Sequence, residues 1–325
     1  MITIKDVAEQ AGVSPSTASR ALRQIGYISK ETHERVFQAA SNLGYIAYAG
    51  AQQLKKNTVK TVGFILSDSS NEYYFGILAD IQRMLNENNM NLIIAFSSEN
   101  PKDEASGFRS LIASRVSYIF FTPTSDKNYD IIQTAKKNGI KVVQLFRDIY
   151  PELDSIVSDD ESGCRQAAEK LLELGCRRLL LIDIKYPYLD SEKVRPDRST
   201  GFLKALQNRN VQNKILRFPL FDYDTSVLEK AIISFAPDGI IAGTNVARIE
   251  VLFLLKHKLP KSIRLIVFDD NRWLDLISVS AIHQDSKDLT NKIRDIVCIP
   301  QDEVRKLVFP QHLIVRNQCY TYACK

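Results

Sequence analysis

The chain has 325 residues, 45% of them hydrophobic, and a formal net charge of +5, which is typical of a globular protein of two or three domains. The charge is uneven, because the first 60 residues hold eight Lys or Arg against four acidic residues. The five cysteines are scattered without metal-ligand spacing, and neither a charged-then-apolar leader nor an apolar run of membrane-spanning length is present. We therefore expect a soluble cytoplasmic protein with reduced thiols, without metal or cofactor, whose basic end contacts nucleic-acid phosphates.

Near the N-terminus, the sequence predicts two short helices in close succession. Thr3 can cap the first helix together with Asp6, and Gly12 suits the left-handed turn that ends it. Ser14 and Pro15 then supply a hydroxyl cap and a proline at the first helical position of a second helix, which runs to about residue 23. A third helix is expected over about 30–43. This order is typical of a helix-turn-helix, which places its second helix in the DNA major groove.

The second helix has the residues of a base reader. Its small apolar side chains can face the core, which leaves four polar side chains outward: Ser16, Thr17, Ser19 and Arg20. Arginine can fork onto the guanine edge, and serine or threonine can bond bases or phosphates. From the pattern alone, a polar surface helix in an ordinary small bundle remains the alternative.

The stretch TIKDVAEQAGVSPSTASRAL, continued by ISKETHERVFQAASNLGY and AQQL, resembles the headpiece of the LacI/GalR family of bacterial repressors. The resemblance implies a DNA-binding headpiece over residues 1–46 and a homodimer on a near-palindromic double-stranded operator. Besides the four outward residues, it implies DNA contacts by Thr3, Ser14, Tyr27, Tyr45 and Leu54.

Residues 47–60 are expected to form a hinge helix and linker. In the resembled family a leucine of the hinge enters the minor groove, and Leu54 stands at that position in AQQL. Gly50 would cost such a helix about 1 kcal/mol relative to alanine, so the helix is expected to form only on DNA. A plain linker with one apolar residue is the alternative.

From residue 61 onward, buried apolar runs alternate with amphipathic helical stretches. The runs are TVGFIL, LIIAF, YIFFT, KVVQLF, SIVSD, RRLLLID, KILRFP, GIIAG and IRLIVF. Such alternation predicts an α/β fold of doubly wound parallel sheets. Because the strands are too many for one small sheet, we expect two lobes, the first over about 61–157 plus 286–310 and the second over about 162–283 plus 311–325. A ligand cleft would lie between them at the carboxyl ends of the strands.

This part of the chain resembles the periplasmic-binding-protein-like effector domain of the same family, in pieces such as VGFILSDSSNEYY, RSTGFLKAL and LIVFDD. The resemblance implies that Arg198 and Asp269 grip a small effector. It also implies effector contacts by Asn245, Thr244, Phe221, Tyr74, Phe75, Ser67 and Asp68. Each residue has a structural alternative: the charged ones as ion-pair partners or loop caps, the aromatic ones as core, and Ser67 and Asp68 as helix caps.

The effector is expected to be a sugar or sugar derivative, because a guanidinium and a carboxylate together suit hydroxyl groups. Phe146 stands where many members of the family carry an aspartate, which indicates a rebuilt cleft. Two other classes of function are open to a chain with such lobes. A transporter's sugar-binding protein should begin with a secretory leader and lack the basic head, and an enzyme should show a catalytic motif, which this sequence lacks. We therefore predict a transcriptional regulator, most simply a repressor, rather than an enzyme.

Overall fold

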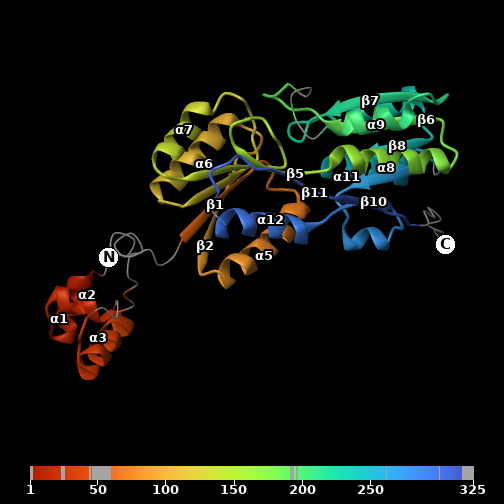
Figure 1. The fold of residues 1–325 in the computed structure, drawn as a ribbon. Helices are drawn as coiled ribbons and strands as arrows, with labels where there is room; N and C mark the ends of the chain where they lie inside the picture. Colours follow the sequence, from red (N-terminus) through yellow and green to blue (C-terminus); the bar gives the residue numbers. More distant parts are fainter. Residues whose placement is uncertain are drawn as a thin grey trace. The chain divides into compact units, whose positions relative to one another are not determined.

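The computed structural model describes residues 3–22, 26–43, 45, 60–190, 194, 197–260, 262–299 and 301–316. Its residues fall into two compact units, 1–59 and 60–325, which are considered separately. Figure 1 shows the elements of both units.

The first unit is a three-helix bundle of α1 (Ile4–Ala11), α2 (Pro15–Leu22) and α3 (Lys30–Leu43). The backbone N–H of Thr3 donates to Asp6 Oδ2 at 2.6 Å, which satisfies one of the free donors at the start of α1. Gly12 ends α1 at φ +65°, and the Ser14 hydroxyl accepts from the backbone of Thr17 at the start of α2. The core is built of small side chains, which lets the helices approach closely: Val7, Ala8, Ala11, Ala18, Ala21, Val36, Ala39 and Ala40.

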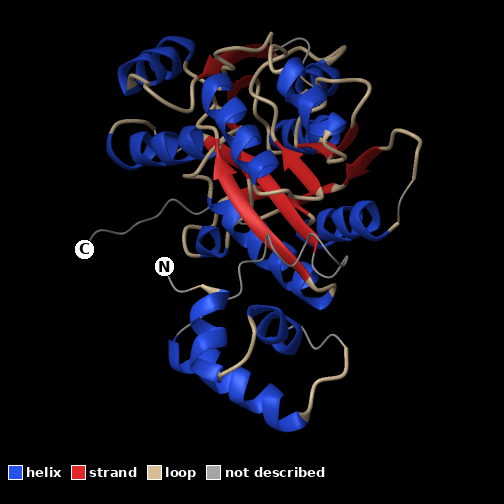
Figure 2. Ribbon diagram, turned by 90° about the vertical axis from the view of Figure 1, so that its left-hand side faces the viewer, coloured by secondary structure: helices blue, strands red, loops and turns tan. Residues whose placement is uncertain are grey.

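The second unit holds two six-stranded sheets, one in each lobe, and Figure 2 shows their strands between layers of helices. The first sheet has the order β11-β5-β4-β3-β1-β2 and all its pairs are parallel. Its strands are β1 (Lys60–Leu66), β2 (Met90–Phe96), β3 (Tyr118–Phe121), β4 (Lys141–Leu145), β5 (Asp154–Ser158) and β11 (Lys306–Phe309). Its helices are α5 (Glu72–Glu87), α6 (Pro101–Ala113), α7 (Tyr129–Lys137) and α12 (Ser286–Cys298).

The second sheet repeats this plan in the order β12-β10-β9-β8-β6-β7. Only β12 is antiparallel to its neighbour. The strands are β6 (Arg178–Ile184), β7 (Gln212–Phe218), β8 (Gly239–Ala242), β9 (Arg264–Phe268), β10 (Ser280–Gln284) and β12 (Gln311–Ile314). The helices are α8 (Asp160–Glu173), α9 (Arg198–Leu206), α10 (Thr225–Phe235), α11 (Asn245–His257) and the short 3-10 turn η1 (Arg272–Asp275).

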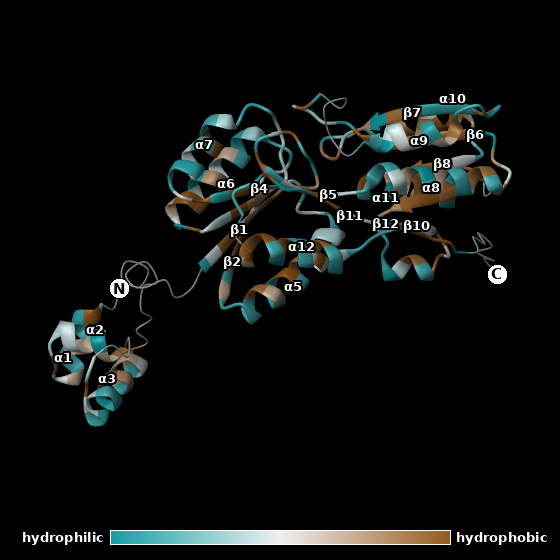
Figure 3. Ribbon diagram, viewed as in Figure 1, coloured by the Kyte–Doolittle hydropathy of each residue, from teal (hydrophilic) through white to brown (hydrophobic). Residues whose placement is uncertain are grey.

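Each sheet is covered on both faces. In the first lobe α5 and α12 bury one face and α6 and α7 the other, while in the second lobe α10 and α11 lie opposite α8 and α9. Figure 3 shows hydrophobic residues gathered on the strands and on the helix faces that meet them. Burial on both faces is the reason that the central strands read as continuous apolar runs. The expected doubly wound α/β fold is confirmed.

Capping residues fix the starts of two helices near the cleft. Helix α5 starts at Glu72, because the Asn71 side chain accepts from the Tyr73 backbone and caps it. Helix α11 starts at Asn245, because Thr244 Oγ1 accepts from the backbone of Ala247. None of the helices in the described ranges is long and apolar enough to cross a membrane.

The chain crosses between the lobes three times, after β5, after β10 and after β11. The crossing segments are bonded to one another: the Asp159 N–H donates to the Phe309 carbonyl at 2.9 Å, and the Asp285 N–H to the Pro310 carbonyl at 3.4 Å. These three segments bring the carboxyl ends of the strands of both lobes to a common cleft.

Candidate effector site and nucleic-acid interface

The headpiece presents a polar surface on α2. Ala18 and Ala21 are fully buried, while Ser16 and Arg20 are exposed and Thr17 and Ser19 are half-buried. Helical periodicity therefore separates the core side from an outward side with hydroxyl and guanidinium groups. The Ser14 hydroxyl lies 2.8 Å from the hydroxyls of both Ser16 and Thr17, so these three groups form one cluster at the start of the helix.

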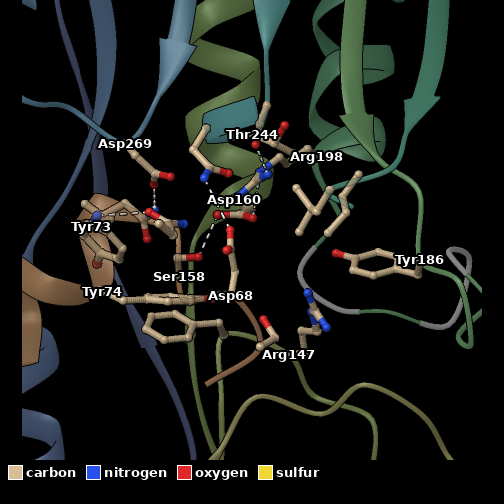
Figure 4. A pocket seen from close by; sticks show the side chains of 18 residues that line it. Asp68, Tyr73, Tyr74, Arg147, Ser158, Asp160, Tyr186, Arg198, Thr244 and Asp269 are labelled. Atoms are coloured by element: carbon tan, nitrogen blue, oxygen red, sulfur yellow. Dashed lines mark hydrogen bonds and ion pairs between the residues drawn. The ribbon is translucent and has the colours of Figure 1, made fainter. Parts of the chain in front are cut away.

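Both lobes line a cavity where their strands end (Figure 4). Residues up to the first crossing contribute Ser67, Asp68, Asn71, Tyr73, Tyr74, Phe146, Arg147 and Ser158. The second lobe and the segments that cross contribute Asp160, Ile184, Tyr186, Arg198, Leu220, Gly243, Thr244, Asn245, Asp269 and Gln284. No cluster of His, Cys, Asp or Glu within the described ranges is arranged to hold a metal ion.

Arg198 lines this cavity from the second lobe, next to Asp160 and Thr244 (Figure 4). Its Nε is 2.9 Å from Asp160 Oδ2, its Nη1 donates to the Gly243 carbonyl, and its guanidinium lies 4.3 Å from the centre of the Phe268 ring. Burial works against the charge, but Asp160 and Asp183 raise the pKa of Arg198 further above its ordinary value. The guanidinium is therefore permanently charged and held in one orientation, as a rigid donor must be.

A close approach of two helices positions Arg198. Gly201 lies on α9 where it crosses α8, and a Cβ there would lie 2.0 Å from the Glu161 carbonyl oxygen. The glycine thus allows backbone-to-backbone packing that a side chain would forbid. Arg198 at the start of α9 is thereby brought within reach of Asp160 at the start of α8.

The two carboxylates near the Arg198 guanidinium, Asp160 and Asp183, have different partners. Asp160 is buried and accepts hydrogen bonds from the Ser158 hydroxyl at 2.6 Å and from the Gln311 amide, and burial raises its pKa. Asp183, behind it, is paired with Arg217, which also donates to the Ser199 hydroxyl at 2.7 Å. The network fixes the position of both acids relative to Arg198.

Asp269 ends β9 with an uncommon backbone, at φ +63°. Its carboxylate accepts from the Gln284 amide, and its carbonyl accepts from Arg248 Nη1 at 2.8 Å. Arg248 is 1% exposed and lies with its guanidinium 5.2 Å from the centre of the Trp273 ring. A buried arginine therefore holds the backbone that turns the Asp269 carboxylate toward the cavity.

The first lobe supplies an aromatic wall. The rings of Tyr74 and Phe146 stack with centres 5.1 Å apart, and Tyr73 lies edge-on to Phe146 at 6.2 Å. The Tyr73 hydroxyl is buried without a hydrogen-bond partner in the described structure. Burial, followed by the charge of Asp269, raises the Tyr73 pKa well above its ordinary value, so the group remains a donor.

Arg147 closes the opposite side of the cavity (Figure 4). It forms a buried pair with Glu99, with Nη1 2.9 Å from Oε2 and a second contact through Nη2, and it donates to the Pro123 carbonyl at 2.8 Å. Its guanidinium lies 4.6 Å from the centre of the Tyr186 ring in the other lobe. Its charge is therefore compensated within the first lobe.

Comparison with known proteins identifies the family. The family model described as "Bacterial regulatory proteins, lacI family" matches residues 3–47, and the one described as "Periplasmic binding proteins and sugar binding domain of LacI family" matches residues 59–249, more than half of the chain. The chain belongs to the LacI family. It is a DNA-binding transcriptional regulator with an effector domain, and not an enzyme.

Named members of the LacI family are similar over nearly the whole chain. The ribose operon repressor of Lactococcus lactis is 26% identical and the alignment covers 98% of each protein. The ribose operon repressor of Bacillus subtilis is 29% identical over 83% of this chain and 82% of the relative. Among solved structures, the Lac repressor bound to ONPG has a TM-score of 0.75 at 20% identity, with 97% of this chain and 98% of that one covered.

Most of the effector residues expected from the LacI resemblance line the cavity. Arg198, Asp269, Asn245, Thr244, Tyr74, Ser67 and Asp68 do so. Phe75 does not, and 55% of its surface is exposed. Phe221 is half-buried in the loop after β7 and is also absent from the lining, where its neighbour Leu220 is found instead. The roles of the residues that line the cavity stay predictions.

Several lining residues of this LacI-family cleft were missed by the sequence interpretation. They are Asn71, Tyr73, Arg147, Ser158, Asp160, Ile184, Tyr186, Leu220, Gly243 and Gln284. Ser158, Asp160 and Gln284 lie at the crossings between lobes, so their positions follow from strand order rather than from local pattern. Tyr73 gave a usable signal, because it directly precedes Tyr74, which was expected to contact the effector.

Polar contacts join the lobes at the mouth of the cavity. Asn245 Nδ2 lies 3.3 Å from Asp68 Oδ2 and 3.4 Å from the Ser70 hydroxyl. On α5, Glu72 Oε2 accepts from Asn271 at 2.6 Å and Trp273 Nε1 at 3.2 Å, with Arg248 Nη2 at 3.4 Å. One carboxylate of the first lobe thus bonds three donors of the second, and we refer to this group as the Glu72 bridge.

The remaining DNA-binding residues expected from the LacI resemblance lie in different environments. Thr3 and Ser14 are exposed at helix starts, and Tyr27 is fully exposed between α2 and α3. Tyr45 packs against the bundle core and is partly buried. Leu54, with the hinge helix expected around it, lies outside the described residues.

Proposed function

We propose that this protein represses transcription from a near-palindromic operator and that a sugar or sugar derivative, bound between its lobes, controls its affinity for DNA. The observation that carries the proposal is the occurrence on one chain of a helix-turn-helix with an exposed polar second helix and a cleft lined by Arg198 and Asp269. Relatives named ribose and sucrose operon repressors support a sugar as the effector class. Because its target is the bacterial chromosome, the protein acts in the cytoplasm.

In the proposed complex, α2 enters the major groove. Arg20 reads a base pair, and the hydroxyl cluster at Ser14, Ser16 and Thr17 bonds bases or phosphates. Leu54 enters the minor groove next to Lys55 and Lys56, which are placed to contact phosphates. Thr3, Ser19, Tyr27 and Tyr45 complete the contacts on each half-site.

We propose a homodimer, because the near-palindromic target requires two headpieces. The edge strand β2 supports it with three apolar side chains, Ile93, Ile94 and Phe96, each more than a third exposed. The adjoining α5 adds the exposed Phe75. An apolar edge strand beside an apolar helix is a surface that soluble proteins cover by association.

The proposal is tested by operator selection followed by ligand titration. The full chain is mixed with a random DNA library at fixed salt, the bound sequences are amplified, and the affinity for the enriched sequence is then measured with and without a panel of sugars. We expect a near-palindromic sequence whose affinity changes with at least one sugar. A chain that binds sugars but enriches no sequence would instead be a carbohydrate-binding protein without a regulatory role, and the proposal would fail.

A further inference from the structure

We infer that the ligand of the cavity is uncharged and amphipathic, a polyol that carries an apolar or aromatic ring, and that Phe146 selects for this ring. The inference rests on the proposed function, because it names the chemical class of effector that the same cleft takes. Two independent observations carry it: the pairing of every cavity arginine with an acid, and a difference between two equivalent positions of the lobes.

The cavity has no free positive charge to bind an anion. No lysine or histidine is among the described residues that line it, and its two cations are Arg147 and Arg198. Arg147 uses both terminal nitrogens on Glu99 and the Pro123 carbonyl, and Arg198 is bound by Asp160 with Asp183 behind it.

The lining also includes Asp68 and Asp269, so carboxylates outnumber guanidinium groups around the cavity. A phosphate or carboxylate ligand would lose its hydration without gaining a cation of its own. Burying an unpaired charge costs far more than burying a hydroxyl that finds a partner. The cavity therefore favours neutral ligands over their phosphorylated or acidic derivatives.

The two lobes carry different side chains at equivalent positions. Strand β4 is third in the order of the first sheet and β9 is third in the order of the second. The residue directly after each strand, Phe146 and Asp269 respectively, has φ +63° and lines the cavity. The same left-handed backbone conformation therefore presents a phenyl ring from one lobe and a carboxylate from the other.

A left-handed backbone is costly for a phenylalanine and persists where the surrounding structure fixes it, commonly at ligand-binding sites. Here the ring is stacked on Tyr74 and held edge-on by Tyr73 and Phe309, yet it is only half-buried. It forms an apolar shelf in the cavity wall. Arg198, which donates, and Asp269, which accepts, lie across from it in the second lobe.

A ligand that fits both walls has hydroxyls on one side and an apolar face or ring on the other. Nucleosides and aryl glycosides share this chemistry. The Tyr73 hydroxyl, buried without a partner, is a donor that such a ligand could satisfy at the boundary between the two walls. Simple sugars would leave most of the shelf unused.

The test is calorimetric titration of the full chain with matched ligands. The probes are ribose and glucose as plain sugars, uridine and phenyl β-glucoside as neutral ring-bearing partners, and uridine 5′-monophosphate and phenyl β-glucoside 6-phosphate as charged ones. We expect at least one ring-bearing probe to bind about tenfold more tightly than its plain sugar and than its phosphorylated counterpart. Uridine and phenyl β-glucoside distinguish the two sources of the ring.

The Phe146→Leu variant keeps an apolar side chain but removes the ring. We expect it to lose most of the preference for the ring-bearing probe, measured as the ratio of its affinities for the ring-bearing probe and for the plain sugar. The matched control is Tyr188→Ala, which removes a half-exposed ring that is not part of the lining. Thermal unfolding of both variants verifies that each is folded, and Phe146→Tyr provides a second variant that retains the ring.

Three results would overturn the inference: tighter binding of a phosphorylated probe than of its neutral counterpart, an unchanged ring preference in Phe146→Leu, or no binding of any uncharged probe by a chain that binds its operator. Failure of the proposed function is a different result, because it is the absence of operator binding in the wild-type protein without any ligand.

Discussion

Replacing Glu72 by alanine should loosen the contact between the lobes. In the Glu72 bridge, one carboxylate oxygen accepts from Asn271 at 2.6 Å and from Trp273 at 3.2 Å, with Arg248 at the limit of hydrogen-bond distance. Hydrogen bonds to a charged acceptor contribute about 1.5–3 kcal/mol each, but the Glu72 side chain is 55% exposed and solvent reduces this. We expect a loss of roughly 2 kcal/mol, or about a 30-fold smaller ratio of bridged to separated lobes.

The single tryptophan of the chain reports this change directly, because Trp273 donates its indole N–H to Glu72. Acrylamide should quench Trp273 fluorescence more strongly in Glu72→Ala than in the wild type, and effector affinity should fall because fewer molecules hold the lobes together. Glu87→Ala, at the other end of the same helix, is the control. Unchanged quenching in Glu72→Ala, with the protein folded, would refute the view that this carboxylate holds the lobes.

Three further predictions concern other parts of the molecule. Arg20→Ala should weaken binding to the preferred operator by roughly 1–3 kcal/mol and relax one base position, as measured on a randomised operator library. Arg198→Ala should abolish the response to effector in operator-binding titrations and lower stability by about 3–5 kcal/mol, because it leaves the buried Asp160 carboxylate without its cation. Burial raises the pKa of Glu104 from 4.5 to about 7. Between these two pH values the folded state therefore holds a proton that the unfolded state releases, so the free energy of unfolding should fall as pH rises from 4.5 to 7, by at most about 3 kcal/mol. Denaturant unfolding between pH 5 and 8 should show this slope, and Glu104→Gln should flatten it.

Much of the fold follows from periodicity. Most of the apolar runs became central strands because both faces of each sheet are covered, although LIIAF and KILRFP formed the edge strands β2 and β7. Local cap residues such as Gly12 and Ser14 mark the ends of the headpiece helices. These signals are local, so they can be read without knowledge of the three-dimensional structure.

The site was less predictable, because its geometry depends on distant partners. The family resemblance pointed to Arg198. Its ion-pair partner Asp160 lies on another helix, and the close packing of the two helices at Gly201 brings the two side chains together. The pairing of Arg147 with Glu99, 48 residues away, has no sequence signature. Phe221 was expected in the cavity, yet the course of the loop after β7 places Leu220 in the lining instead.

The segment around Pro310 has a consequence for how this chain is made. Strand β11 is the edge of the first sheet and β12 is the edge of the second, and a single proline separates them. During synthesis, neither lobe can complete its sheet until residues 306–314 have left the ribosome, although most of each lobe has been available long before. Each sheet therefore lacks one edge strand until this late stage, and the two lobes complete their folding at about the same time. A nonsense mutation before residue 306 would leave two incomplete sheets rather than one intact lobe.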